Sequence, residues 1–205
     1  MSLRTDNNMT NTGIIVLAAG NASRFGTAKQ LLPFGRKTLL QHVIDEASAA
    51  GASPIVLVTG AYAEAISADL KITGIDVVFN KNWAEGQASG IVAGVHHMMT
   101  VHPEVQNIIL AVCDQPFVSA DLFLQLIKKQ QESGKNMVAS AYAGTVGTPV
   151  LFSRKYFDAL LTLQGDKGAK KLLLAHPEHL VTVDFPKGQL DIDTREDYEG
   201  FLKQI

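Results

Sequence analysis

The chain has 205 residues, of which 46% are hydrophobic and 19% charged, and its formal net charge is −2. This length suits one domain with a sizeable core. The small net charge and the lack of a basic run argue against nucleic acid or an anionic membrane surface as the main partner. The longest apolar runs have the length of strands, so we expect no transmembrane span. Residues 1–12 are polar and lack the apolar centre of a signal peptide, which predicts a disordered leader and a cytoplasmic protein.

Residues 13–205 are expected to form a single domain in which strands and helices alternate. The expected strands are 14–17, 54–59, 75–79, 107–112 and 137–141, and the expected helices are 39–50, 63–70, 90–99 and one from the Ser119 cap to residue 133. This order predicts a three-layer α/β/α sandwich with a mainly parallel, Rossmann-like sheet. Ligands of such sheets bind where the strands end, so the loops at strand ends are the candidate sites.

A turn of small residues follows the first expected strand and carries two spaced cations. In Ala18–Gly20 the side chains are almost absent, so backbone N–H groups can approach a ligand closely, and Gly20 and Gly26 permit positive φ. The guanidinium of Arg24 and the ammonium of Lys29 suit phosphate oxygens. The stretch therefore predicts a triphosphate cradle, although its spacing matches neither a Walker loop nor a dinucleotide fingerprint. The alternative is a solvated turn with two surface cations.

The pattern from Leu17 to Pro33, L-A-A-G-x-x-S-R-F-G-x-x-K-Q-L-L-P, resembles the signature loop of nucleotidyltransferases that activate sugars and cofactors. The double alanine and the Q-L-L-P end are most similar to the molybdenum cofactor cytidylyltransferases and other MobA-like nucleotidyltransferases. Later motifs extend the resemblance almost to the C-terminus. It implies a set of nucleotide-binding residues: Leu17, Ala18, Ala19, Gly20, Ser23, Arg24, Lys29, Gly86 and Ser89.

The loop over residues 80–90 joins an expected strand to an expected helix and is rich in polar and small residues, as a site for a base and ribose would be. It is similar to a loop of the related cytidylyltransferases that touches the nucleotide, although residues 88–90 depart from their usual Ser-Ser-Leu. Gly86 and Ser89 would contact the ligand at the helix N-terminus. Trp83 either contributes to this site or packs the loop against the sheet.

Asp114 directly follows a buried strand, within the tripeptide Asp-Gln-Pro. From its position alone, Asp114 either turns the chain or serves a ligand. The tripeptide resembles the metal-binding element of the nucleotidyltransferase family, in which the carboxylate holds Mg²⁺ against the phosphates, and Mg²⁺ prefers hard oxygen ligands. Asp193 is the expected second ligand and Asp191 the alternate, since residues two apart in an extended segment point the same way. Because two carboxylates repel each other, replacing either by asparagine is expected to leave stability unchanged or slightly raised.

The segment from residue 191 also contains a helix start. Thr194 is expected to cap the last helix, with Asp197 completing a capping box. The pattern matches the D-I-D-T-P-E-D-Y of the cytidylyltransferases, except that Arg195 replaces the proline. Both residues suit the first helical position, so no change of fold is expected.

Two further patterns resemble the part of the family that receives the second substrate. They are G-x-P-x-x-F and G-D-x-G-A, and the residues they imply are Gly147, Pro149, Gly165, Asp166 and Gly168. Lys167 or Lys170 would be available to a phosphate of that substrate. The alternative for the second pattern is an ordinary solvated turn.

The remaining candidates for chemistry are few. Cys113 is the only cysteine, so an internal disulfide is excluded, and its apolar strand predicts an inert buried thiol. His96 and His97 are neighbours, and the other histidines have no metal-ligand spacing among themselves, so a zinc enzyme is not expected.

The resemblance implies a Mg²⁺-dependent nucleotidyltransferase that transfers CMP from CTP to molybdopterin-type molybdenum cofactor and releases pyrophosphate. Its catalytic residues would be Arg24, Lys29 and Asp114. A molybdoenzyme or its maturation chaperone would be a further partner, whereas nucleic acid and membrane would not. The alternatives are a cytidylyltransferase for a methylerythritol or sugar phosphate, and a non-catalytic nucleotide-binding protein that handles a cofactor.

Overall fold

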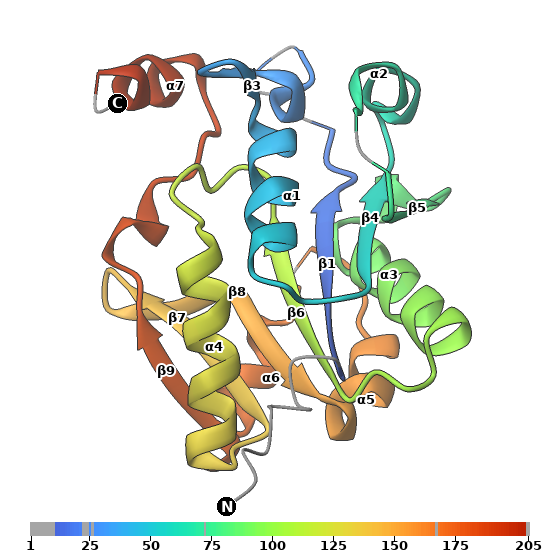
Figure 1. Cartoon of the computed structure of the whole chain (residues 1–205), viewed down its shortest axis with the longest axis vertical. Helices are drawn as coiled ribbons and strands as arrows, with labels where there is room; N and C mark the ends of the chain where they lie inside the picture. Colours follow the sequence, from blue (N-terminus) through green and yellow to red (C-terminus); the bar gives the residue numbers. More distant parts are fainter. Residues whose placement is uncertain (1–10, 22–24, 26, 72, 167, 204–205) are drawn as a thin grey trace, which may run out of the picture.

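A seven-stranded sheet forms the centre of the protein in the computed structural model, which describes residues 11–21, 25, 27–71, 73–166 and 168–203 (Figure 1). The strand order is β5-β4-β1-β6-β8-β7-β9. The strands are β1 Thr12–Ala18, β4 Ile55–Thr59, β5 Asp76–Phe79, β6 Asn107–Val112, β7 Met137–Tyr142, β8 Thr145–Ser153 and β9 Leu180–Asp184. Two short strands, β2 Pro33–Phe34 and β3 Lys37–Thr38, form a separate hairpin.

The helices are α1 Leu39–Ala49, α2 Ala63–Asp69, α3 Gln87–Val101, α4 Ala120–Ser133, α5 Phe157–Leu161, α6 Lys170–Ala175 and α7 Arg195–Leu202. Helices α1 and α4 cover one face of the sheet, and α3, α5 and α6 cover the other. Single-turn 3₁₀ helices lie at Lys29–Leu31, Trp83–Glu85, Arg154–Tyr156, Pro177–His179 and Pro186–Gln189. Figure 1 looks onto the face that α1 and α4 cross.

The central strand β1 supplies both core layers. Ile14 and Val16 pack into the cluster with α1 and α4, whereas Ile15 and Leu17 pack into the cluster with α3 and α5. Burial on both faces explains why this strand reads as a continuous apolar run. Each fully buried aliphatic side chain contributes about 1.5–3 kcal/mol, so β1 is a major source of stability. The predicted three-layer sandwich is confirmed.

The sheet is mainly parallel, as predicted, with β8 as its antiparallel strand. Strand β8 pairs antiparallel with both β6 and β7, and every other pair in this sheet is parallel. A two-residue turn, Ala143–Gly144, joins β7 to β8, and its φ angles are +48° and +72°. Such a turn closes a hairpin, since a parallel connection needs a much longer crossover.

The fold begins slightly earlier than expected. Thr12 is buried in β1 opposite Asn107, so the expected boundary before Gly13 is one residue late. The rest of the expected leader, residues 1–10, lies outside the described residues. In the part of the chain that is described, no helix is both long and apolar enough to cross a membrane. A cytoplasmic location stays a prediction.

The predicted helix caps are confirmed. Thr38 accepts a hydrogen bond from the amide of Gln41, and Ser119 accepts one from the amide of Leu122. At the last helix the side chains of Thr194 and Asp197 form the reciprocal capping box. These bonds satisfy amides that have no partner inside the helix, which fixes where each helix starts.

Candidate active site

A pocket of about 540 Å³ lies at the carboxyl ends of β1 and β6. This is the edge at which open α/β sheets bind ligands. Its volume is in the usual range for a small-molecule site. Of the residues predicted from the sequence, it is lined by Leu17, Ala18, Ala19, Gly20, Lys29, Gly86, Asp114 and Asp166.

A buried glutamine holds the turn after β1. The side-chain amide of Gln30 donates to the carbonyls of Ala18 and Gly20, at 3.0 and 3.1 Å. Gly20 does not adopt the positive φ that glycine permits, since it is not among the glycines with that conformation. Apart from its chain neighbours, no atom of the described residues lies within 4 Å of the position a Cβ would take there. Gly20 therefore provides room at the pocket rather than an unusual backbone angle.

Lys29 joins two acidic residues that are far apart in the sequence. Its Nζ lies 2.6 Å from Oδ2 of Asp114 and 2.9 Å from Oδ1 of Asp193. The lysine side chain is only 14% exposed. Burial lowers the pKa of Lys29, but the charge and hydrogen bond of Asp114, with the hydrogen bond of Asp193, outweigh burial and raise it above the ordinary value. The ammonium therefore stays protonated and places a positive charge between two carboxylates.

An extended segment carries Asp193 to this place. The amide of Ile192 donates to the carbonyl of Asp114 at 3.0 Å, while the Ile192 side chain is buried. Asp191 and Asp193, on either side of it, are exposed, so the alternation expected from the sequence is present. Asp191 lines a neighbouring pocket. Although its side chain is reached by solvent, the surrounding protein partly desolvates its carboxyl, and this desolvation, together with the charges of Asp114 and Asp193, raises the pKa of the carboxyl to about 6.

The donor atoms here suit a hard divalent cation. Oδ1 of Asp114 is buried and has no hydrogen-bond partner among the described residues. Oδ2 of Asp114 and Oδ1 of Asp193 already converge on one positive charge, that of Lys29. Carboxylate oxygens are the protein ligands that Mg²⁺ and Mn²⁺ prefer. The residues thus fit the predicted metal, and their role as ligands stays a prediction.

A second buried glutamine, Gln115, holds the chain in position next to Asp114. No role was expected for it from the sequence. The side chain of Gln115 is 1% exposed, donates to the carbonyl of Gly188 at 2.9 Å, and accepts from the hydroxyl of Thr148 at 3.1 Å. These bonds tie the end of β6 to β8 and to the segment before Asp191. A glutamine after a strand has no distinctive spacing, so only the fold reveals this function.

The loop before α3 requires a glycine. Gly86 has a φ of +103°, and a Cβ there would lie 2.8 Å from the carbonyl oxygen of Gly165 and would also overlap Asp166. The amide of Ala88 donates to that same carbonyl at 3.1 Å. Two loops expected to bind different substrates are therefore in direct contact.

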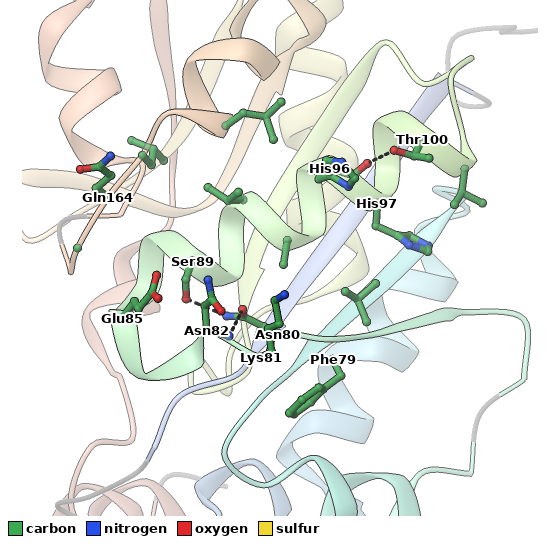
Figure 2. Close-up of a pocket in the computed structure, with 17 residues that line it drawn as sticks. Phe79, Asn80, Lys81, Asn82, Glu85, Ser89, His96, His97, Thr100 and Gln164 are labelled. Atoms are coloured by element: carbon green, nitrogen blue, oxygen red, sulfur yellow. Dashed lines mark hydrogen bonds between the residues drawn. The ribbon is translucent and has the colours of Figure 1, made fainter.

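Ser89 contacts Gly86 but does not line the 540 Å³ pocket. Its hydroxyl donates to the carbonyl of Gly86 and accepts from the amide of Asn80, both at 2.8 Å. It lines a different pocket of about 760 Å³, where Figure 2 shows it beside Asn80 and Asn82. That pocket is larger but does not include Lys29 or Asp114. The two hydrogen bonds of Ser89 stabilise the loop. Because the larger pocket lacks Lys29 and Asp114, pocket volume alone does not identify the candidate active site.

The residues expected to receive the second substrate are divided between several places. Gly147 and Gly168 line a pocket of about 320 Å³ that shares Leu17 and Gln87 with the 540 Å³ pocket. Gly165 lines the 760 Å³ pocket, whereas Asp166 lines the 540 Å³ pocket. Pro149 lines none of these three pockets. It is buried, and its carbonyl accepts a hydrogen bond from Ser140. Four other residues singled out from the sequence, Ser23, Arg24, Gly26 and Lys167, lie outside the described residues.

Residues 14–180 match the MobA-like NTP transferase domain. The chain belongs to this family. The matched range includes the β1 turn, Lys29, Asp114 and the loop at Gly86, while Asp193 lies beyond it.

Solved structures and curated relatives match nearly the whole chain. The structure of Rv0371c from Mycobacterium tuberculosis H37Rv is 34% identical, covers 95% of this chain and 99% of that chain, and has a TM-score of 0.81. A complex of Rv0371c with manganese is 32% identical, covers 96% and 100%, and has a TM-score of 0.78. Nicotine blue oxidoreductase of Paenarthrobacter nicotinovorans is 28% identical over 90% of this chain and 93% of its own length. Molybdenum cofactor cytidylyltransferase of Escherichia coli K12 is 25% identical over 90% and 92%.

Proposed function

We propose that this protein is a Mg²⁺-dependent nucleotidyltransferase that transfers CMP from CTP to molybdopterin-type molybdenum cofactor, with release of pyrophosphate. The observation that carries the proposal is the cluster of Lys29, Asp114 and Asp193 beside the Ala18–Gly20 turn. Membership of the MobA-like NTP transferase family supports the reaction class. The cytidylyltransferase of Escherichia coli supports the acceptor, and the manganese complex of Rv0371c supports a divalent metal.

The residues of the 540 Å³ pocket would act mainly by positioning and by charge. The amides of Ala18–Gly20 would approach the phosphates, because these residues have little or no side chain and Gln30 holds their carbonyls. Asp114 and Asp193 would hold the metal, with Asp191 as the alternate. When bound, the metal would offset phosphate charge and help to align the reacting groups. Positioning and preorganised charge are the usual sources of rate in phosphoryl-type transfer.

Lys29 would have two positions. Without substrate its ammonium neutralises Asp114 and Asp193. When those carboxylates hold a metal ion, the ammonium would be released toward the phosphate oxygens, where it adds positive charge. The lysine would therefore keep the acidic pair together between turnovers and contact the triphosphate during them.

The acceptor would bind in the adjoining 320 Å³ pocket. Leu17 and Gln87 line both pockets, so ligands in the two would be neighbours. Lys170 lines the 320 Å³ pocket and could pair with the acceptor phosphate. That phosphate would attack the α-phosphorus of CTP while pyrophosphate leaves. A covalent cysteine intermediate is not needed, and burial raises the pKa of the Cys113 thiol to about 12.

A panel of nucleotides and acceptors tests the proposal. Pyrophosphate release is measured with CTP, GTP and ATP, each with molybdenum cofactor, methylerythritol phosphate or a sugar phosphate. The proposal predicts turnover with CTP and molybdenum cofactor, and a larger thermal shift with CTP than with GTP. Turnover only with another acceptor would support the other cytidylyltransferases. CTP binding without any turnover would support a cofactor-handling protein, for which a molybdoenzyme or its chaperone is the partner to test.

A further inference from the structure

Three metal-ligating side chains meet at the end of the sheet opposite the candidate active site. Asp76 is the first residue of β5, and His97 and His102 lie at the C-terminal end of α3. Oδ2 of Asp76 lies 2.8 Å from Nε2 of His97 and 2.7 Å from Nε2 of His102. One atom from each side chain falls in a group that spans no more than 4.8 Å. Figure 2 shows His97 on α3, well separated along the helix from Ser89.

The fold creates this group, which explains why the sequence did not predict a zinc site. The two histidines are five residues apart, so they do not follow the one-turn spacing at which a regular helix places two ligands side by side. His102 is the C-cap residue of α3, with a φ of −125°, so it has left the helical conformation. Asp76 comes from a strand 21 residues before His97.

The chemistry of the group suits a borderline transition-metal ion. Both imidazoles use Nε2–H to donate to one carboxylate oxygen, and a divalent cation could replace these two protons. Zn²⁺ with bonds of about 2.0–2.1 Å would place tetrahedral ligand atoms about 3.3 Å apart, so the three side chains need to open by roughly 0.5 Å. The three side chains are 36%, 27% and 23% exposed, which leaves access for the ion and for a water ligand.

A carboxylate lies near the other ring nitrogen of His102. The Glu104 carboxylate is 3.8 Å from Nδ1 of His102, on the side of the ring away from Asp76. This distance is too long for a hydrogen bond, so Glu104 would have to move closer to orient a metal-bound His102.

A second group in the described part of the chain is less suitable. His176 and His179 lie 3.5 and 3.6 Å from Glu178, whose side chain is 60% exposed. Nδ1 of His179 is also in contact with the hydroxyl of Tyr156. In this group both imidazoles face an exposed carboxylate through Nδ1, and Nδ1 of His179 is already bonded to Tyr156. The group is therefore used as a control for Zn²⁺ binding.

We propose that Asp76, His97 and His102 bind one Zn²⁺ ion, with water as the fourth ligand. The ion joins the edge strand β5 to the end of α3 and acts as a structural clip. The site is independent of the proposed nucleotidyl transfer, because it lies at the amino end of β5 and shares no residue with the 540 Å³ pocket.

Calorimetric titration with Zn²⁺ tests this site, in a protein that also carries Asp114→Asn and Asp193→Asn so that the candidate active site does not compete. The expected result is one equivalent of Zn²⁺ and a rise in melting temperature of about 5 °C at 100 times the Kd. Adding His97→Gln or His102→Gln should weaken binding at least about 100-fold. Glutamine keeps an N–H donor for Asp76, and circular dichroism checks that each variant is folded.

Two matched variants complete the test. His96→Gln changes the exposed neighbour of His97, and His176→Gln changes the second group; both should bind Zn²⁺ like the parent. Absence of stoichiometric binding would overturn the proposal, as would equal binding by the parent and the His97→Gln and His102→Gln variants. Loss of binding only in His176→Gln would assign the ion to the second group instead.

Discussion

The Nζ atom of Lys29 lies 2.6 Å from Oδ2 of Asp114, across 85 positions of sequence. This ion pair changes the expected behaviour of the acidic cluster. Asp114 and Asp193 were expected to repel each other, and that expectation was wrong because Lys29 contacts both. Any cation that takes the place of Lys29 must first compete with a bound ammonium group.

Replacing Lys29 by alanine should reduce both stability and phosphate binding. The change leaves Asp114 and Asp193 facing each other without a cation, which should cost about 1–3 kcal/mol. It should also weaken CTP far more than cytidine, since only CTP carries the phosphates. Calorimetry with both ligands measures this. Lys37→Ala is the matched control, because the pair of Lys37 with Asp45 is only partly buried and its loss should cost less than about 1 kcal/mol. Equal losses for CTP and cytidine would show that Lys29 does not bind phosphate.

Replacing Asp114 by asparagine should lower turnover by about 10²–10³-fold, the usual loss when one preorganised charged group is removed. Its melting temperature should also fall, because the bond to Lys29 loses its charge. Asp193→Asn should have a smaller effect on stability, since that side chain is 51% exposed. Thermal melts in metal-free buffer and turnover against Mg²⁺ concentration provide the two readings. Asp45→Asn is the control for loss of a carboxylate elsewhere, and normal Mg²⁺ dependence in Asp114→Asn would exclude this aspartate as a ligand.

Two glycines of the pocket should respond differently to alanine. Gly86→Ala forces a side chain into a φ of +103° and against Gly165, so it should cost at least about 1–3 kcal/mol. The Cβ of Gly20→Ala meets no atom within 4 Å in the described part of the chain outside its immediate neighbours, so the stability of this variant should change little. If Gly20 leaves room for phosphate, its variant should nevertheless bind CTP more weakly. A Gly20→Ala variant with unchanged melting temperature and unchanged CTP affinity would show that the Ala18–Gly20 turn does not bind the triphosphate.

Most of the fold could be predicted because its strands and caps carry local signals. The continuous apolar run of β1 and the side chains of Thr38 and Ser119 fix elements without help from distant residues. The antiparallel direction of β8 was harder to predict, because it depends on the positive φ of Ala143 in the turn before it. Alanine rarely adopts a positive φ, so its sequence position gives no sign of this turn.

The candidate site was predictable only where a residue sits at a strand end. Asp114 follows β6 directly, so its position relative to the β1 turn follows from a parallel sheet. The bonds of Gln30 and Gln115 depend on carbonyls 12 and 73 residues away, and the group around Asp76 depends on the packing of β5 on α3. Contacts between residues so far apart produce no recognisable spacing pattern in the sequence.

The carboxyl of Asp191 should make stability depend on pH. Its pKa is raised from 3.8 to about 6, so the folded state binds a proton more readily than the unfolded state. This group therefore favours folding most at low pH, and its contribution becomes less favourable as pH rises from about 4 to about 6. Asp191→Asn should raise the melting temperature at pH 7.5 and have little effect at pH 4. Thermal melts of the parent and of Asp191→Asn from pH 4 to pH 7.5 test this prediction. A gain in melting temperature that grows toward low pH would contradict the raised pKa of Asp191.

The central claim is tested most directly by following the α-phosphorus of CTP. The protein is incubated with Mg²⁺, molybdenum cofactor and CTP labelled at that phosphorus, and the cofactor is then separated and examined by mass spectrometry. The account predicts labelled CMP joined to the cofactor, one pyrophosphate for each product, and about 10²–10³-fold less of both with Asp114→Asn. Pyrophosphate without a labelled acceptor, or equal product from the Asp114→Asn variant, would contradict it.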